Sequence, residues 1–337
     1  MILELFQTHI AAALLAFTPA PALSLSDTIP PWRDPSPHQV IHVQVSNSVQ
    51  LEVLDWGGRG KPLIFLAGGG EAAHVYDGFA PRFTGRFRVL GITRRGVGSS
   101  SHPAAGYDTT TLIRDIVSVL DSVGISRASF VGHSFAGSEL NALAVRYPQR
   151  VDRMIYLDSA FDFRALFDSP EWKSGALETP QPPEGTYEDN SIFSWTLWAE
   201  RLSGPGYPEA AVRALYEFGP DGQFVGSRSI DSVIDRLGRG TEPVALHRIK
   251  APALALYAVP GSAEVMYPWW QTLDPTARAK GQKSFEALSR LHSRLRDQFR
   301  DEVSRVRVVI IPGARHCIFL TDPGEVTHAM LEFLTTS

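Results

Sequence analysis

The chain has 337 residues, 44% of them hydrophobic, which is enough for one large domain with a sizeable insertion. A net charge of −4 offers no basic surface that would favour nucleic acid or an anionic membrane. The single cysteine, Cys317, excludes an internal disulfide and leaves the compartment open.

The first 26 residues differ in composition from the rest. Ile10–Phe17 is a short apolar run, and Ala20–Ala22 matches the small-residue cleavage site of a signal peptide, although no Lys or Arg precedes the run. The run is too short to span a bilayer as a helix. We predict a signal peptide and leader over 1–26, and hence export to the periplasm or the medium. If the segment is kept as a frayed helix, we expect a cytoplasmic protein. Residues 26–37, rich in Pro and Ser, predict a flexible lead into the fold.

A hairpin and a series of short strands come next. Apolar residues alternate in 41–45 and again in 49–53, which predicts two paired strands with one buried face. The later apolar runs mostly lack alternation, as is typical of strands covered on both faces in a parallel sheet. These runs lie at 63–66, 87–90, 130–131, 154–157, 254–257 and 306–311.

Segments with the helical spacing of apolar residues separate these strands. They cover 112–120, 140–144 and 326–334, and Gly124 stands where a C-terminal cap belongs. Strand–helix units that follow an antiparallel start predict a three-layer α/β domain with a mostly parallel sheet. We assign this core to residues 27–160 and 250–337.

Two stretches interrupt the alternation. Residues 161–249 are far longer than an ordinary connection and contain several Trp, Pro and Gly residues. They predict a mainly helical cap over the carboxyl edge of the sheet, where ligands bind in open α/β sheets. Residues 264–304 predict one long charged helix with an apolar stripe from Phe285 to Phe299.

The strongest functional signal is the stretch Ser129–Gly137, in which an apolar run reaches a serine that has a small residue, Gly132 or Ala136, two positions away on either side. Residues 139–144 then read as a helix. A strand that turns sharply into a helix holds the residue at the bend in a strained conformation and leaves its side chain accessible. This pattern predicts a nucleophile elbow, usually G-x-S-x-G, with Ser134 as the nucleophile and Ala136 in the last position.

His316 is the candidate base, placed just after the strand predicted over 306–311. A serine hydroxyl is a poor nucleophile at its normal pKa, so a base must take its proton and later return it to the leaving group. Without the elbow, an exposed loop histidine would be the simpler interpretation. Candidate oxyanion donors are the amide of Gly69, in a glycine-rich turn, and the amide of Phe135, directly after the nucleophile.

Together these residues resemble the α/β-hydrolase superfamily over nearly all of 40–335. The order Ser134 then His316 is that of the superfamily. Thr93–Ser100 looks like its D-x-R-G-x-G-x-S loop with Thr in place of Asp, and Leu66–Gly69 is similar to its H-G-x loop with Ala67 in place of His. The resemblance implies an α/β-hydrolase fold and a hydrolase that needs no cofactor. An aspartate at the elbow would have implied epoxide or haloalkane hydrolysis, and Ser134 disfavours both.

Two residues are candidates for the acid that orients His316. The superfamily usually places an Asp a few residues beyond the seventh strand, where this chain has Gly261, with Glu264 three positions later. Asp158, at the end of the strand over 154–157, occupies the alternative position that haloalkane-dehalogenase-like members use. We favour Asp158, with Glu264 as the runner-up. The other interpretations are a cap residue for Asp158 and an exposed loop residue for Glu264.

The resulting hypothesis is a serine hydrolase acting on a small, moderately apolar ester, thioester or lactone through an acyl-enzyme. The alternatives are a hydrolase of amide or C–C bonds and a catalytically weak binding or signalling protein on the same scaffold. No His, Cys and carboxylate spacing along the chain indicates a metal site, and the glycine-rich turn lacks the nucleotide-binding spacings. We expect His133 to pack beside the elbow and His74 to line the pocket mouth. Arg114 and Asp115 should share an exposed helix face.

Overall fold

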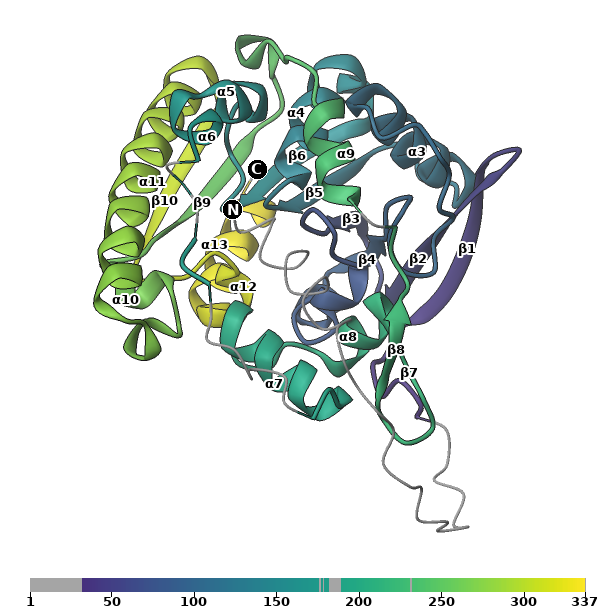
Figure 1. The fold of residues 1–337 in the computed structure, drawn as a ribbon. Coiled ribbons are helices and arrows are strands. Elements are labelled where there is room, and N and C mark those ends of the chain that lie inside the picture. Colours follow the sequence, from purple (N-terminus) through teal and green to yellow (C-terminus); the bar gives the residue numbers. More distant parts are fainter. Residues whose placement is uncertain (1–31, 176, 178, 182–188, 231, 337) are drawn as a thin grey trace.

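The described residues form an eight-stranded sheet in the order β1-β2-β4-β3-β5-β6-β9-β10 (Figure 1). The structure is a computed structural model that describes residues 32–175, 177, 179–181, 189–230 and 232–336. The signal peptide predicted over residues 1–26 lies outside the described residues.

The sheet is antiparallel at one end and parallel through the rest. The predicted hairpin is β1 (Gln39–Ser46) and β2 (Val49–Gly57), and β2 pairs antiparallel with β4 (Phe87–Ile92). Every later pairing is parallel, which confirms the predicted fold class. The remaining strands are β3 (Lys61–Leu66), β5 (Ala128–His133), β6 (Val151–Leu157), β9 (Ala253–Val259) and β10 (Val306–Pro312).

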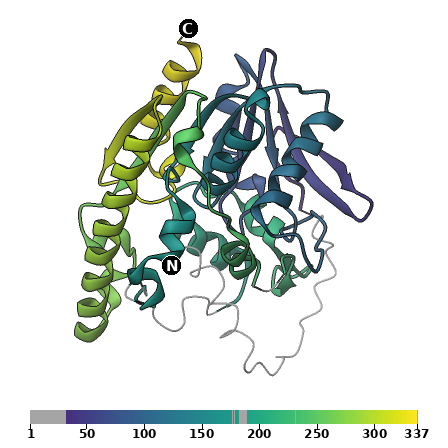
Figure 2. The ribbon, with the colours of Figure 1, turned by 90° about the horizontal axis from the view of Figure 1, so that it is seen from above.

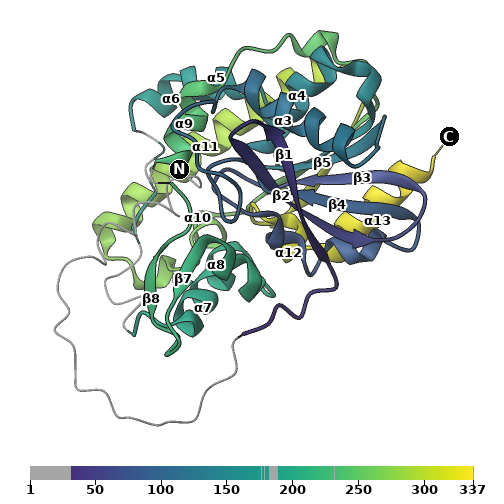
Figure 3. The ribbon, with the colours of Figure 1, turned by 90° about the vertical axis from the view of Figure 1, so that its right-hand side faces the viewer.

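Helices cover both faces of this sheet. Figure 3 shows α3 (Thr109–Ser122) and α4 (Ala136–Arg146) on one face, with α12 (Ile318–Thr321) and α13 (Pro323–Thr335) on the other. The long charged helix predicted over 264–304 is α11 (Pro275–Glu302), which runs along one side of the molecule in Figure 2. Within the described part of the chain, no helix combines the length and apolar character needed to cross a membrane. Short elements complete the core: η1 (Ala73–Tyr76), η2 (Ala80–Phe83), η3 (Pro148–Arg150), η4 (Leu246–Arg248), α10 (Ala263–Met266) and η5 (Trp270–Thr272).

The segment between β6 and β9 contains five α-helices and the short η4 among its described residues, together with a two-stranded sheet that the sequence analysis did not predict. Strands β7 (Tyr216–Phe218) and β8 (Phe224–Ser227) pair antiparallel, and they are too short for an alternating pattern to stand out. Trp195 stacks on Phe224 with ring centroids 4.9 Å apart and so ties the sheet to a neighbouring helix. The helices are α5 (Phe163–Asp168), α6 (Pro170–Lys173), α7 (Ile192–Ser203), α8 (Glu209–Leu215) and α9 (Val233–Gly240).

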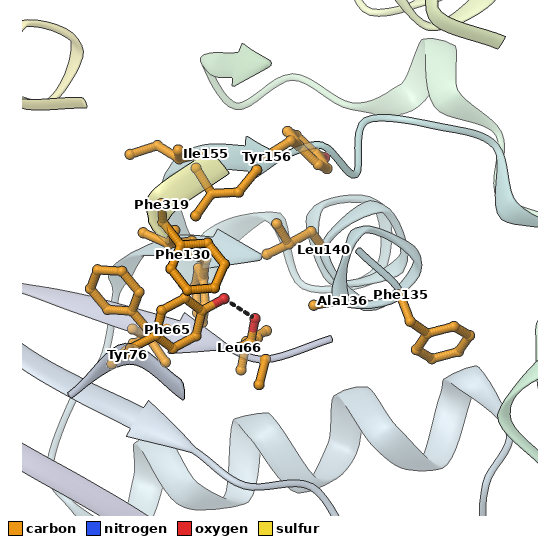
Figure 4. Packing of buried hydrophobic residues seen from close by; sticks show 14 of the residues in the cluster. Phe65, Leu66, Tyr76, Phe130, Phe135, Ala136, Leu140, Ile155, Tyr156 and Phe319 are labelled. Carbon is orange, nitrogen blue, oxygen red and sulfur yellow. Dashed lines mark hydrogen bonds between the residues drawn. The ribbon is translucent and has the colours of Figure 1, made fainter. Parts of the chain in front are cut away.

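Aromatic packing holds the elements at the carboxyl end of β3 together (Figure 4). The ring of Tyr76 lies 4.9 Å from that of Phe65 and 4.8 Å from that of Phe319, and its hydroxyl donates to the carbonyl of Leu66 at 3.0 Å. Because Phe319 belongs to α12, this cluster fixes the segment that follows β10 against the loop that follows β3. Both segments carry candidate site residues.

The expectation that Arg114 and Asp115 share an exposed face of a helix is wrong for Asp115, which lies on α3. Arg114 is exposed, but Asp115 is only 6% exposed and accepts two hydrogen bonds of 2.7 Å from Arg95. Arg95 comes from the loop after β4, so its side chain completes a bidentate pair that brings the carboxylate inside. A charged residue on a helix therefore indicates a solvent-facing side only when no oppositely charged side chain from another part of the chain pairs with it.

Candidate active site

Ser134 sits at the bend between β5 and α4 with a backbone φ of +52°. This value is uncommon for a residue with a side chain and is sustained by close packing on both sides. A Cβ atom on Gly132 would lie 2.7 Å from Leu140 Cδ1, and one on Gly137 would lie 1.9 Å from the Ser159 carbonyl oxygen. The backbone contact requires glycine at 137, whereas a side chain at 132 would have to displace that of Leu140. Ala136 fits the position where the usual pattern has its second glycine.

The side chains of Asp158 and His316 contact each other. Asp158 Oδ2 lies 2.7 Å from His316 Nδ1, and Asp158 Oδ1 accepts a hydrogen bond of 3.1 Å from the amide of Ala258. Asp158 also has a positive φ of +49° and follows β6 directly. With both oxygens engaged, the carboxylate holds the imidazole with Nδ1–H toward it, which leaves Nε2 as the free base.

Glu264, the runner-up acid, lies elsewhere. It is exposed in the first turn of α10 and accepts a hydrogen bond from the side chain of Gln271. It is absent from the residues that line the pocket around His316. Of the two candidates, the structure brings only Asp158 to the histidine.

Ser134 and His316 line the same pocket, which holds about 820 Å³ of space when the part open to solvent is included. His316 Nε2 is buried and has no hydrogen-bond partner among the described residues. Catalytic hydrogen bonds are often long before substrate binds and tighten only in the complex. The geometry therefore presents a hydroxyl and an unpaired imidazole nitrogen, already oriented by a carboxylate, to one cavity.

Of the two predicted oxyanion donors, Gly69 lines this pocket and Phe135 does not. Phe135 follows Ser134 at the start of α4. We find no hydrogen bond to either amide within the described part of the chain. Arg94 fixes the loop that carries Gly69, because its guanidinium donates to the carbonyls of Ala67, at 2.8 Å, and Gly68. The same guanidinium pairs with Glu139 on α4, at 2.9 and 3.2 Å.

Replacing Arg94 by methionine should destabilise the fold by about 3–5 kcal/mol, because it leaves the buried Glu139 carboxylate without its cation. The freed loop carbonyls should also shift Gly69 and lower the turnover of ester substrates. Urea unfolding and an esterase assay would measure the two effects. Arg114→Met is the matched control, since Arg114 is exposed, and its effect should stay within about 0.5 kcal/mol. A loss of stability no larger than that of the control would contradict this role for Arg94.

His133 and Glu71 form a second buried pair beside the elbow, which the sequence analysis missed. Glu71 Oε2 accepts from the amide of Gly68 at 3.1 Å and lies 3.2 Å from His133 Nδ1. Although burial opposes ionisation, hydrogen bonding to His133 holds the pKa of Glu71 below its usual value. His133 Nε2 lies 3.2 Å from the carbonyl of His316. Both ring nitrogens thus face oxygen atoms, and the ring links the backbone of His316 to the glycine-rich loop.

The same pair belongs to a group of possible metal ligands in the pocket. Donor atoms of Glu71, His133 and Cys317 lie within 4.8 Å of one another. Glu71 Oε2 accepts from the amide of Gly68, and both nitrogens of His133 lie 3.2 Å from an acceptor. Burial raises the pKa of the Cys317 thiol well above its usual range, so it packs here as an uncharged side chain.

His292 is a further pocket residue that sequence reasoning passed over. It lies on α11, stacks on Phe161 with ring centroids 4.9 Å apart, and lines the cavity. Burial lowers its pKa to about 4, so the ring is neutral at physiological pH. Its position four residues after Leu288, on the apolar stripe of the helix, was the available signal. His74, expected at the pocket mouth, does not line the pocket and lies in a separate buried cluster.

Comparison with known proteins agrees with the fold described above. A family model described as "alpha/beta hydrolase fold" matches residues 61–323. Epoxide hydrolase A of Mycobacterium tuberculosis is 25% identical over 334 residues, covering 86% of this chain and 95% of that protein. Serine hydrolase-like protein 2 of Homo sapiens is 25% identical over 298 residues, covering 83% of this chain and 88% of that protein.

Solved structures share the fold at lower identity. The crystal structure of E-2-(acetamidomethylene)succinate hydrolase superposes with a TM-score of 0.61 at 21% identity, covering 89% of this chain and all of that one. A bromoperoxidase from Bacillus anthracis gives a TM-score of 0.59 at 16% identity, covering 88% of this chain and 100% of that one. At these identities the likeness shows the architecture and leaves the reaction to be argued from the site.

Proposed function

Since the chain belongs to the alpha/beta hydrolase fold family, we propose that it is a serine hydrolase that cleaves a small, moderately apolar carboxylic ester, thioester or lactone without a cofactor. One observation carries the proposal. His316 Nδ1 is held by Asp158 at 2.7 Å, while its buried Nε2 has no partner among the described residues and borders the pocket that Ser134 lines.

The first half-reaction transfers the acyl group to the enzyme. His316 Nε2 takes the proton of Ser134 as Oγ attacks the substrate carbonyl, and Asp158 stabilises the imidazolium that forms. The amides of Gly69 and Phe135 donate to the oxyanion of the tetrahedral intermediate. The imidazolium then returns the proton to the departing alcohol or thiol, which leaves an acyl-serine.

The second half-reaction uses water in place of the alcohol. His316 takes a proton from a water molecule, whose oxygen attacks the acyl carbonyl of the ester on Ser134. Collapse of the second tetrahedral intermediate breaks the bond to Oγ, and the proton goes back to the serine. The carboxylic acid is released, and Ser134 and His316 recover their starting protonation states.

The pocket lining supports a moderately apolar substrate. One part of it consists of aliphatic and thioether side chains contributed by β9, α7, α10 and α11, together with a loop proline, and such surfaces favour an apolar acyl chain. Arg315 is the only Lys or Arg residue in the lining; it donates to the Arg201 carbonyl at 2.7 Å. A substrate with one polar group near the scissile bond would suit this combination. The apolar residues are Leu202, Ala258, Pro260, Met266 and Leu288.

The likeness to an epoxide hydrolase does not extend the proposal to epoxides. The superfamily members that open epoxides are expected to carry an aspartate at the elbow, and this chain has Ser134 there. Hydrolysis of an amide or a C–C bond would use the same nucleophile and base. A scaffold that only binds ligands would retain the pocket without an active serine, and a covalent probe separates that case from an enzyme.

Labelling with a fluorophosphonate tests the proposal directly. We expect rapid labelling of the native protein, because the oriented imidazole raises the nucleophilicity of the serine. Mass spectrometry of the tryptic peptide 128–146 should place the adduct on Ser134, although the peptide also contains Ser129 and Ser138. The Ser138→Ala variant should label like wild type. No adduct at Ser134 under conditions that label a known serine esterase would refute the proposal.

A further inference from the structure

A second cluster of titratable residues lies outside the pocket, on the segment that leads into β1 and on η1. Asp34, His38, His74 and Asp77 each bring one donor atom to within 4.8 Å of the others. The side chains of His38 and Asp77 are 3% exposed and that of His74 is 10% exposed. None of the four lines the candidate active site. The contact of Asp34 with His74 also shows that the described part of the lead predicted to be flexible over 26–37 is bound to the fold.

The spacing of these donors matches that of ligands around one small cation. His74 Nδ1 lies 3.5 Å from Asp34 Oδ2 and 3.1 Å from Asp77 Oδ2. His38 presents one ring nitrogen to each carboxylate, at 3.6 Å to Asp34 and 2.8 Å to Asp77. Four ligands at the usual Zn–N and Zn–O distances in a tetrahedron are about 3.4 Å apart. The two separations at His74 Nδ1, 3.5 Å and 3.1 Å, lie close to this value. The His38 distances belong to its two different nitrogens, of which one would bind the ion, and one donor atom from each of the four residues lies within 4.8 Å of the others.

Further polar groups hold the same side chains in place. Asp34 Oδ1 accepts from the amide of Ser36 at 2.8 Å, which leaves Oδ2 turned to the cluster. Asp77 Oδ1 accepts from the indole of Trp56 at 2.9 Å. The second nitrogen of His74 lies 3.6 Å from Glu52 Oε1, and Glu52 is itself fixed by the hydroxyl of Thr93 at 2.8 Å. A carboxylate behind a histidine is the outer partner that metal-bound imidazoles usually have.

The charge of the cluster also favours a cation. Three carboxylates, those of Asp34, Asp77 and Glu52, surround two imidazoles. Even with both imidazoles protonated, the group keeps a net negative charge in a largely buried place, which is costly without a counter-ion.

We propose that Asp34, His38, His74 and Asp77 bind one Zn²⁺ ion in a structural site. Imidazole nitrogens and carboxylate oxygens are both ligands that Zn²⁺ accepts in proteins, and four of them complete a tetrahedral site. With neutral rings, the ion and its two carboxylates form an uncharged unit, and Glu52 remains as an outer partner of His74. The site would fasten the lead into β1 to η1, which follows the glycine-rich loop of the candidate active site.

Zinc content and thermal stability test this proposal on the full chain, purified without a histidine tag. After expression with added zinc, elemental analysis should find about one zinc per chain. Removal with dipicolinate should lower Tm by about 5 °C or more, and one equivalent of Zn²⁺ should restore it. Substitution by Co²⁺ should give the visible absorption of a tetrahedral site. These readouts do not depend on hydrolysis. The zinc proposal can therefore be refuted while fluorophosphonate labelling supports the serine hydrolase proposal, and the serine hydrolase proposal can be refuted while zinc binding is found.

Variants locate the metal. His74→Gln and Asp77→Asn should each reduce the zinc content below about 0.1 per chain and abolish the response of Tm to Zn²⁺. His328→Gln, at an exposed position on α13, is the matched control and should retain both. Wild-type protein that carries no zinc, and whose Tm does not change on adding it, would overturn the proposal and leave the cluster as an ion-pair network. If the two variants fail to fold, the zinc content of the wild-type protein and the response of its Tm to Zn²⁺ still decide whether the site binds zinc.

Discussion

Replacing Ser134 by alanine should lower kcat/KM for p-nitrophenyl butyrate by about 10⁴-fold or more. In the proposed mechanism, Ser134 Oγ forms the new bond to the substrate carbonyl carbon in the first step, and no neighbouring group can take its place. The remaining rate should come only from substrate binding and the oxyanion donors. Steady-state kinetics of wild type and variant, on an ester series from acetate to octanoate and on a lactone, would measure the loss for each substrate.

Ser138→Ala is the control for this variant. Ser138 lies one helical turn further along α4, and its buried Oγ has no hydrogen-bond partner among the described residues. Its removal leaves no other group unpaired, so stability and rate should remain near those of wild type. Because alanine meets the same backbone strain as serine at φ +52°, the Ser134 variant should also keep its fold. An undiminished rate in Ser134→Ala would end the serine hydrolase interpretation.

The strands and the elbow could be predicted because their signals are local. The central strands are covered on both faces, so each reads as an unbroken apolar run, and β5 passes directly into the small residues around Ser134. The order of nucleophile and base along the chain then located His316. The predicted signal peptide and the export that it implies stay predictions, since residues 1–26 lie outside the described residues.

Residues joined only by the tertiary fold could not be predicted in the same way. Glu71 and His133 are separated by 62 positions, and each has an unremarkable context in the sequence. The group of Asp34, His38, His74 and Asp77 has no recognisable metal spacing because it comes from two segments on either side of the hairpin. Asp115 was misplaced for the same reason, since Arg95 reaches it from another loop.

The choice between the two candidate acids shows how the geometry of the sheet separates residues that the sequence leaves as alternatives. Asp158 follows β6 and Glu264 follows β9, and these strands are parallel neighbours, so both residues leave the sheet at its carboxyl edge. The positive φ of Asp158 turns its side chain toward His316 within one residue of the strand end. Glu264 lies five residues beyond β9, where α10 has already begun and the side chain meets solvent.

Asp158→Asn should therefore lower kcat by about 10⁴-fold, and Glu264→Gln should leave it near the wild-type value. In the variant, the amide oxygen can still accept from Ala258 N–H, which places the NH₂ group opposite His316 Nδ1. An NH₂ donor there forces the imidazole to carry its proton on Nε2. That tautomer has no lone pair for the proton of Ser134, so attack is blocked although every side chain stays in position.

The fold should tolerate this substitution, because asparagine accepts the left-handed backbone conformation that Asp158 adopts at φ +49°. Thermal unfolding should give similar Tm values for Asp158→Asn, Glu264→Gln and wild type, so that a loss of kcat reports on chemistry. The fluorophosphonate labelling rate should fall in parallel with kcat, since it depends on the same base. Equal kcat values for Asp158→Asn and wild type, or a larger loss in Glu264→Gln, would show that another group orients His316.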